Sequence, residues 1–240
     1  MGLEEQIASY SKTVTLLSTI ILLVISTVSL KIKHPKSVIK KLLFFIIVAI
    51  TITTTLFLAA STIFLNSVSS SKGPVHHHAD FEIWACGQEL NLKDPKGLSN
   101  KIGTSTLHEH NDKRIHLEGV IVKPQDASLG KFFRVIEGEL NQNSIVIPTN
   151  EGQITFRSGE KCPNGQTAIL QVFLYKVSGK SFTQTKLKDP QNYIITPESG
   201  VPPGDCIIIE FDQFKERTDK LCQSFKVAIQ TGKLKGELKY

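Results

Sequence analysis

The chain has little sulfur chemistry. Its 240 residues include a single methionine, Met1, and four cysteines. One methionine is too few for a Met-rich site that handles Cu(I). No two cysteines form a C-x-x-C pair, so the motif of thioredoxin-type redox proteins is absent. The H-E-x-x-H motif is absent as well, which excludes the metalloproteases that are defined by it.

Charge is missing from two long stretches near the start of the chain. Residues 13–30 and 42–65 contain no charged residue and no proline, over 18 and 24 positions. As helices they would be about 27 and 36 Å long, close to or above the thickness of a bilayer core. Their many β-branched residues would favour strands in water, but in lipid only a helix satisfies its own backbone. We therefore predict two transmembrane helices.

Lysines are concentrated between these two stretches, whereas Glu4 and Glu5 precede the first one. By the positive-inside rule the connection faces the cytoplasm, so the N-terminus and everything after the second helix lie outside. Alternatively, the second stretch is a signal peptide cleaved near Ala60, which would also export the domain. We expect a membrane hairpin with its tether at residues 1–71 and an extracytoplasmic domain at 72–240, at the cell membrane. The lysines are Lys31, Lys33, Lys36, Lys40 and Lys41.

The positive charge of the chain reflects this topology. Residues 1–71 hold six of the 28 basic residues and two of the 22 acidic ones, a net +4, which leaves +2 for residues 72–240. A nucleic-acid-binding domain would carry a much stronger basic surface. We therefore expect a lipid bilayer and not a nucleic acid among the partners.

All four cysteines lie in the expected exported domain. An even number of cysteines in an oxidising compartment predicts two disulfides, and three pairings are open. Buried free thiols are the alternative. The cysteines are Cys86, Cys162, Cys206 and Cys222.

Histidine is the residue that this domain concentrates. Six of the seven histidines fall between residues 76 and 116, and potential ligands are spaced two apart in three short motifs. A spacing of two is the period of a strand, so each pair lies on one face of a sheet. In the first motif the opposite face is apolar, with Ala79, Phe81 and Ile83. The pairs are His76 with His78, His108 with His110, and His116 with Glu118.

The second and third motifs are separated by the polar residues 111–114, which predicts a hairpin. Its ligands converge only if His108 lies opposite His116, which leaves Leu107, Ile115 and Leu117 on the core side. A register shifted by one residue would scatter the site.

The rest of the domain is β-rich. A Cys86-Gly87 turn joins two strands, and Ser128 caps a helix whose apolar residues follow helical spacing up to residue 137. Residues 144–148, 153–156, 167–177 and 205–211 are rich in strand-forming residues. The expected fold class is α+β, with two N-terminal transmembrane helices followed by a β-rich extracytoplasmic domain.

Two resemblances add to this interpretation. HHHADFEIWACGQELNL, LHEHNDKRIHLEG and SLGKFFRV resemble uncharacterised, membrane-anchored bacterial and archaeal proteins with the pattern HxHADF, LHxH, IHxE or IHxH, and LGxFF. Residues 86–87, 129–133 and 204–209 also resemble the turn, helix and late Gly-Asp strand of β-grasp (ubiquitin-like) domains. The second resemblance implies a β-grasp-like fold in which the histidine hairpin is an insertion before the helix.

Imidazoles with a carboxylate and no thiolate suit a transition metal, with zinc or copper as the expected ions. We predict metal ligands among His76, His78, His108, His110, His116 and Glu118. Asp80 and Glu109 are the carboxylates expected to orient the imidazoles. The expected function is metal capture or handling at the cell surface.

Four alternatives remain at this stage. The histidines form the site of a metal-dependent enzyme, the face of a module that binds an envelope protein, a pH sensor, or simply a hydrogen-bonded polar strand face. The sequence does not say whether the chain is an enzyme.

Overall fold

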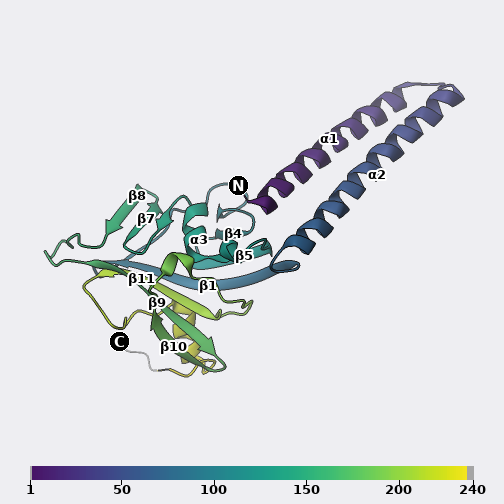
Figure 1. The fold of residues 1–240 in the computed structure, drawn as a ribbon. Coiled ribbons are helices and arrows are strands. Elements are labelled where there is room, and N and C mark those ends of the chain that lie inside the picture. The colour runs from purple at the N-terminus through teal and green to yellow at the C-terminus, as the bar shows by residue number, and fades with distance from the viewer. Residues whose placement is uncertain (1, 237–240) are drawn as a thin grey trace. The chain divides into compact units, whose positions relative to one another are not determined.

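The computed structural model describes residues 2–236 and divides the chain into two compact units. The first ends at Gly73 and the second begins at Pro74. Figure 1 shows the first unit as two helices and the second as a domain built around a sheet. The α+β class expected from the sequence is confirmed.

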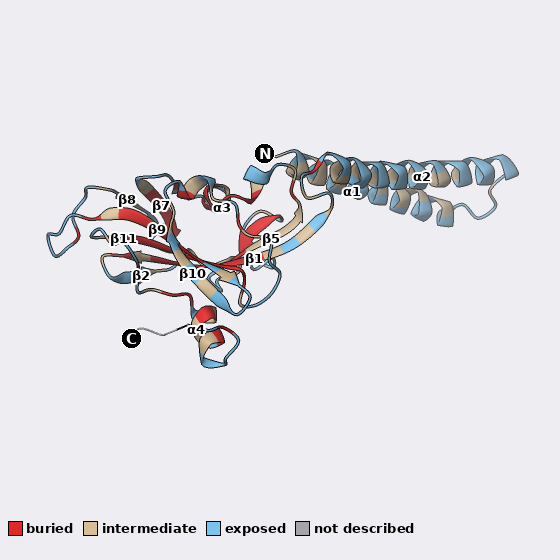
Figure 2. Ribbon diagram, turned by 60° about the horizontal axis from the view of Figure 1, so that its bottom comes forward, coloured by how far each residue is buried: buried red, intermediate tan, exposed pale blue. Residues whose placement is uncertain are grey.

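The first unit consists of helices α1 (Leu3–Lys31) and α2 (Ser37–Val68). Neither helix contains a buried residue, and both are drawn in pale blue and tan in Figure 2. One polar contact between them joins the hydroxyls of Ser18 and Thr54, 2.7 Å apart. Both helices are long and apolar enough to cross a membrane. Because α2 continues to Val68, the connection to the domain is shorter than the tether expected from the sequence.

The second unit has eleven strands among the described residues. A mixed sheet has the order β10-β9-β11-β1-β5-β4-β3, with β2 paired to β1 outside this path, and β6, β7 and β8 form a second antiparallel sheet. The strands are β1 (Pro74–Ala85), β2 (Gln88–Leu90), β3 (Ile102–Gly103), β4 (Leu107–Glu109), β5 (Arg114–Val120), β6 (Glu139–Leu140), β7 (Ser144–Thr149), β8 (Gly152–Arg157), β9 (Ile169–Ser178), β10 (Ser181–Lys186) and β11 (Asp205–Asp212). The helices are α3 (Leu129–Val135), α4 (Gln223–Gln230) and the 3-10 turns η1 (Pro124–Ala127) and η2 (Pro190–Asn192).

Strand β1 is the centre of the main sheet. Its first half pairs antiparallel with β5, and its second half pairs antiparallel with β2, while β11 runs parallel beside it from Asp80 onward (Figure 1). The turn into β2 lies at Cys86 and Gly87, where both residues have positive φ, as a type I′ turn requires. Since β5 is the neighbour of β1, the histidine hairpin, which lies between β2 and α3 in the chain, belongs to the main sheet.

The sheet is covered on both faces. On one side Phe81 packs against Phe132 of α3, with ring centroids 5.4 Å apart, within the larger apolar core. On the other side Cys206 and Ile208 of β11 pack against Phe225 of α4 in a smaller core. Alternate side chains of β11 therefore enter two different cores, which accounts for its nearly continuous apolar sequence (Figure 2). Ser128 caps α3 as predicted, because its side chain accepts a hydrogen bond from the Lys131 N–H.

All four cysteines are disulfide-bonded. Cys86 pairs with Cys162 and Cys206 with Cys222, across sequence separations of 76 and 16 residues. In the chain-entropy model, loops of these sizes stabilise the fold by roughly 4.5 and 3 kcal/mol. The two disulfides expected from the sequence are confirmed, and the structure chooses their pairing.

Candidate metal centre

Three neighbouring strands bring the three histidine motifs together. In β1 and β5, His76 lies opposite Glu118, and His78 lies opposite His116. In β4 and β5, His108 lies opposite His116. This is the register that the sequence required, and Leu107, Ile115 and Leu117 are buried on the core side as expected.

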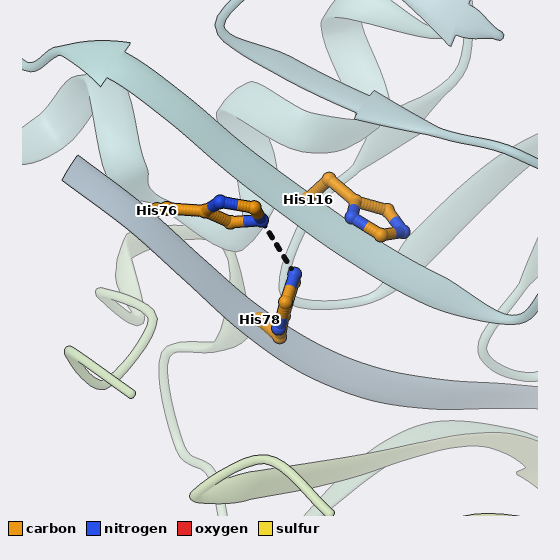
Figure 3. Close-up of side chains that lie close together, drawn as sticks. All are labelled: His76, His78 and His116. Carbon is orange, nitrogen blue, oxygen red and sulfur yellow. Dashed lines mark hydrogen bonds between the residues drawn. The ribbon is translucent and has the colours of Figure 1, made fainter. Parts of the chain in front are cut away.

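The closest group consists of His76, His78 and His116 (Figure 3). One ligand atom from each ring lies within 4.8 Å of the others. The Nε2 atoms of His76 and His78 are 3.0 Å apart. Ligands about 2.0 to 2.1 Å from a tetrahedral metal lie roughly 3.3 Å apart, so the spacing of this pair is close to that of metal ligands. His76 is exposed and His78 is buried, so the group lies at the surface with one side open.

The outer nitrogens of two of these rings are held by the protein. His78 Nδ1 donates to the carbonyl of Ser199 at 3.2 Å, and His116 Nε2 donates to the Asp112 carboxylate at 3.1 Å. Each bond places the proton on the outer nitrogen and leaves the inner one, Nε2 of His78 and Nδ1 of His116, as a lone pair. A carbonyl or carboxylate behind a ligating imidazole is the usual arrangement in metal sites.

Glu118 supplies a carboxylate to the same face. Its Oε1 lies 3.2 Å from His76 Nε2, and its Oε2 lies 4.0 Å from His108 Nε2. The carboxylate therefore lies between the β1 histidines and the β4 histidine. Carboxylate oxygen and imidazole nitrogen form a common mixed ligand set for zinc.

His108 and His110 lie on the far side of His116 from β1. The rings of His108 and His116 are nearly parallel, 9° between planes, with centroids 5.5 Å apart. His110 is edge-on to His108, with centroids 4.8 Å apart, and its Nδ1 donates to the carbonyl of Asn100 at 2.5 Å. These two residues are adjacent to the closest group without belonging to it.

Burial keeps two of these imidazoles in the neutral form. Burial, together with the charges of Lys101 and neighbouring histidines, lowers the pKa of His108 to about 4. Burial also lowers the pKa of His78, and the neighbouring His116 and His76 lower it further. Neutral imidazole is the form that binds a metal, so both rings are ready as ligands at neutral pH.

The two carboxylates expected to orient imidazoles have other partners. Asp80 accepts a hydrogen bond from Arg114 Nε at 2.6 Å and another from the Ser224 hydroxyl. Glu109 Oε1 accepts the backbone N–H groups of Asp112 and Lys113 and thereby shapes the hairpin turn. Asp112 takes the orienting role that the sequence had assigned to them.

Sequence reasoning missed Asp112 and Ser199. Asp112 was only a polar turn residue, although its position four residues before His116 is within reach of that ring. Ser199 lies 121 residues after His78, in a loop that also accepts the His78 backbone N–H through the Glu198 carbonyl at 2.7 Å. A backbone carbonyl contributed by a distant loop has no residue-type signal in the sequence.

A cavity of about 450 Å³ adjoins this site. Asp80, Asp112, Arg114 and Ser224 are among its lining residues. Asp112 contacts both the cavity and the His116 ring, so a molecule in the cavity would lie one residue away from a bound metal.

No protein-family model, curated protein or solved structure matches this chain. The relationship expected from the HxHADF, LHxH, IHxE and LGxFF motifs therefore stays a prediction. Function is inferred from the geometry of the chain's own side chains.

Proposed function

We propose that the domain binds a transition-metal ion, Zn²⁺ or Cu²⁺, through His76, His78 and His116, with Glu118 as a fourth ligand. The observation that carries this proposal is the group of three imidazole nitrogens within 4.8 Å of one another. Hydrogen bonds behind two of the rings support it, since they direct the free lone pairs of His78 and His116 inward. The expected role is metal capture or handling at the cell surface.

The donor set supports zinc or copper. Nitrogen ligands with one carboxylate are of borderline hardness, whereas Mg²⁺ and Ca²⁺ prefer oxygen ligands alone. All four cysteines are engaged in disulfides, so thiolates do not compete for the ion. Disulfides also support an oxidising compartment outside the cytoplasm.

We further propose that α1 and α2 cross the membrane with the N-terminus and the domain outside. The lysines at the connection between the helices support this orientation. In intact cells, an impermeant thiol reagent is expected to label a Ser9→Cys variant and not a His34→Cys variant, since His34 lies in the connection. Labelling of His34→Cys and not of Ser9→Cys would show that the helices have the opposite orientation.

Metal analysis of the full-length, untagged protein in detergent tests the metal site. After equilibration with Zn²⁺ and removal of free metal, the wild type is expected to retain at least one ion per chain. His76→Ala/His78→Ala is expected to lose the ion bound by these residues. The matched control is His34→Ala/His77→Ala, because neither histidine belongs to the proposed site. Equal metal content in wild type and His76→Ala/His78→Ala would refute the site.

The cavity beside Asp112 supports a second candidate function, a metal-dependent enzyme. Such an enzyme needs a coordination position open to substrate, and His76 is on the exposed side of the group. A crystal structure with Zn²⁺ would distinguish the two functions: a water ligand facing the cavity favours the enzyme, and four protein ligands favour metal capture.

The β-grasp resemblance also stays a proposal. Its support is the position of the first and last strands of the sheet, since β1 and β11 are parallel neighbours at its centre. Helix α3 lies between β5 and β9 in the sequence and packs on one face. The arrangement bears on function only by placing the site on β1 and β5.

A further inference from the structure

The histidine array is too wide and too divergent for one metal ion. Its members lie on three adjacent strands, so β1 and β4 are separated by two strand spacings, roughly 9.6 Å. Two ligands of the same zinc ion lie at most about 4.2 Å apart, and the ligand atoms of His76, His78 and His116, within 4.8 Å of one another, are already close to this limit. The observed ring positions do not close this distance, because the His108 ring lies on the far side of His116, parallel to it.

Ring orientation separates His108 from the first group. The lone pair of an imidazole nitrogen lies in the plane of its ring. The rings of His108 and His116 are 9° from parallel with centroids 5.5 Å apart, so their lone pairs lie in different planes. An ion in the plane of His116 is therefore out of the plane of His108, which must serve a different position.

His108 and His110 are prepared to bind at that position. The His108 side chain is 2% exposed, and its Nδ1 is buried with no hydrogen-bond partner in the described part of the chain. Its Nε2 is 4.0 Å from the Glu118 carboxylate, which is longer than a hydrogen bond. The bond from His110 Nδ1 to Asn100 leaves His110 Nε2 as a free lone pair.

Glu118 lies between the two groups with one oxygen on each side. Oε1 is 3.2 Å from His76 Nε2 in the first group, and Oε2 is 4.0 Å from His108 Nε2 in the second. Pairs of metal ions in protein sites lie about 3.5 to 4 Å apart, close enough for one carboxylate to ligate both. The position of Glu118 on the central strand β5 is the one that a bridging ligand requires.

We propose that a second transition-metal ion binds at His108 and His110 and that Glu118 bridges it to the ion held by His76, His78 and His116. This inference rests on the proposed function, because the first ion holds the other oxygen of Glu118. The domain then carries a two-metal centre across β1, β5 and β4.

The number of bound ions tests this proposal. The full-length, untagged protein is equilibrated with Zn²⁺, and bound metal is counted per chain for wild type, His108→Ala/His110→Ala and the control His34→Ala/His77→Ala. We expect two ions in the wild type, one in His108→Ala/His110→Ala and two in the control. His110→Ala alone serves as a second variant, because His110 is only partly buried and its loss spares the core. It is expected to weaken the second ion more than about 10-fold.

Each outcome separates the second ion from the first. One ion in both wild type and His108→Ala/His110→Ala would overturn the second ion and leave the first intact. One ion in wild type and none in His108→Ala/His110→Ala would mean a single site that depends on these two histidines, which would overturn both assignments. No bound metal in wild type would overturn both as well.

Loading with Cu²⁺ tests the bridge. Two Cu²⁺ ions about 4 Å apart are magnetically coupled, so the electron paramagnetic resonance signal should account for less than the copper content. In Glu118→Ala we expect the second copper to bind more weakly and any remaining signal to be uncoupled. Two fully uncoupled coppers in the wild type would overturn the bridging role of Glu118.

Discussion

The two halves of β1 carry the same alternating pattern and differ in what their polar side chains contact. In the first half, His76 and His78 contact each other and lie beside His116. In the second half, Asp80 is bonded to Arg114 and Ser224, and Glu82 accepts a hydrogen bond from the Trp84 indole. One half is open, whereas the other is covered by the segment that contains α4.

The difference shows how a polar strand face divides between binding and structure. In the covered half, Asp80 is neutralised by Arg114 of β5, and Glu82 accepts a hydrogen bond from Trp84 of the same strand, so these contacts contribute to the fold. In the open half, basic groups of one kind face each other, an arrangement that does little for the fold without a ligand. Substitutions in the two halves should therefore change different measured quantities.

The largest expected effect is on stability, in Asp80→Ala. Asp80 is 4% exposed, and its removal leaves Arg114 without its ion pair. Breaking a buried pair from one side costs about 3 to 5 kcal/mol of unfolding free energy. Denaturant unfolding of the full-length protein in detergent should show this loss, while zinc content under native conditions stays at the wild-type value.

Asp80→Ala/Arg114→Leu is the matched comparison for that variant. Removing both charges should cost less than removing one, because no unpaired buried charge remains. If Asp80→Ala instead keeps its stability and loses metal, Asp80 orients the imidazoles as the sequence first indicated, and the division of β1 into two halves fails.

The next effect is a loss of stability in acid, which should come from His108 of the neighbouring strand β4. In the metal-free protein the pKa of His108 is about 4, against 6.5 for an unperturbed histidine. The unfolded chain therefore binds the proton first, and stability is complete above about pH 6.5 and falls as the pH drops towards 4. The unfolding free energy lost through His108 over this range is roughly 3 kcal/mol.

A His108→Gln variant isolates this effect, because the raised pKa values of Glu82 and Glu109, both caused mainly by burial, act in the opposite direction. Unfolding free energies are measured in chelator at pH 7 and pH 4.5. The wild type should lose more stability than His108→Gln over this interval. Equal losses would mean that His108 titrates normally and is not held in the neutral form.

Local patterns allowed much of the candidate site to be predicted. The spacing of two in each histidine motif is a strand property, and the apolar residues between the ligands fix which face is buried. The His108 to His116 register was the condition for the ligands to converge, and the structure meets it. The turn at Cys86-Gly87 and the cap at Ser128 are equally local. Each of these features depends on residues within a few positions of one another.

Long-range features could not be predicted in the same way. The cover over Asp80 comes from α4, whose short sequence carries only Phe225 and Ala228 as buried residues. The Cys206–Cys222 disulfide links the start of this helix to β11. The sequence left three pairings of the cysteines open, so this link could not be predicted from it. The Ser199 carbonyl behind His78 depends on a loop that is distant in the chain.

The smallest expected effect is on metal affinity, at Asp112 in the turn between β4 and β5, which contacts both His116 and the cavity. Burial raises the pKa of Asp112, but the hydrogen bond and charge of His116 outweigh it and leave this pKa below its usual value, so the carboxylate is ionised at neutral pH. An ionised carboxylate behind an imidazole fixes the ring and strengthens its lone pair, and losing such a group weakens metal binding about 10 to 100-fold.

Asp112→Ala should show that loss in Zn²⁺ competition titrations, and Asp112→Asn should lie between it and the wild type, because an amide oxygen still accepts the Nε2–H. Glu151→Ala removes an exposed carboxylate away from the site and should bind like the wild type. If Asp112→Ala binds zinc normally, His116 does not need its outer hydrogen bond, and the ring must be held by the strand pairing of β5 alone.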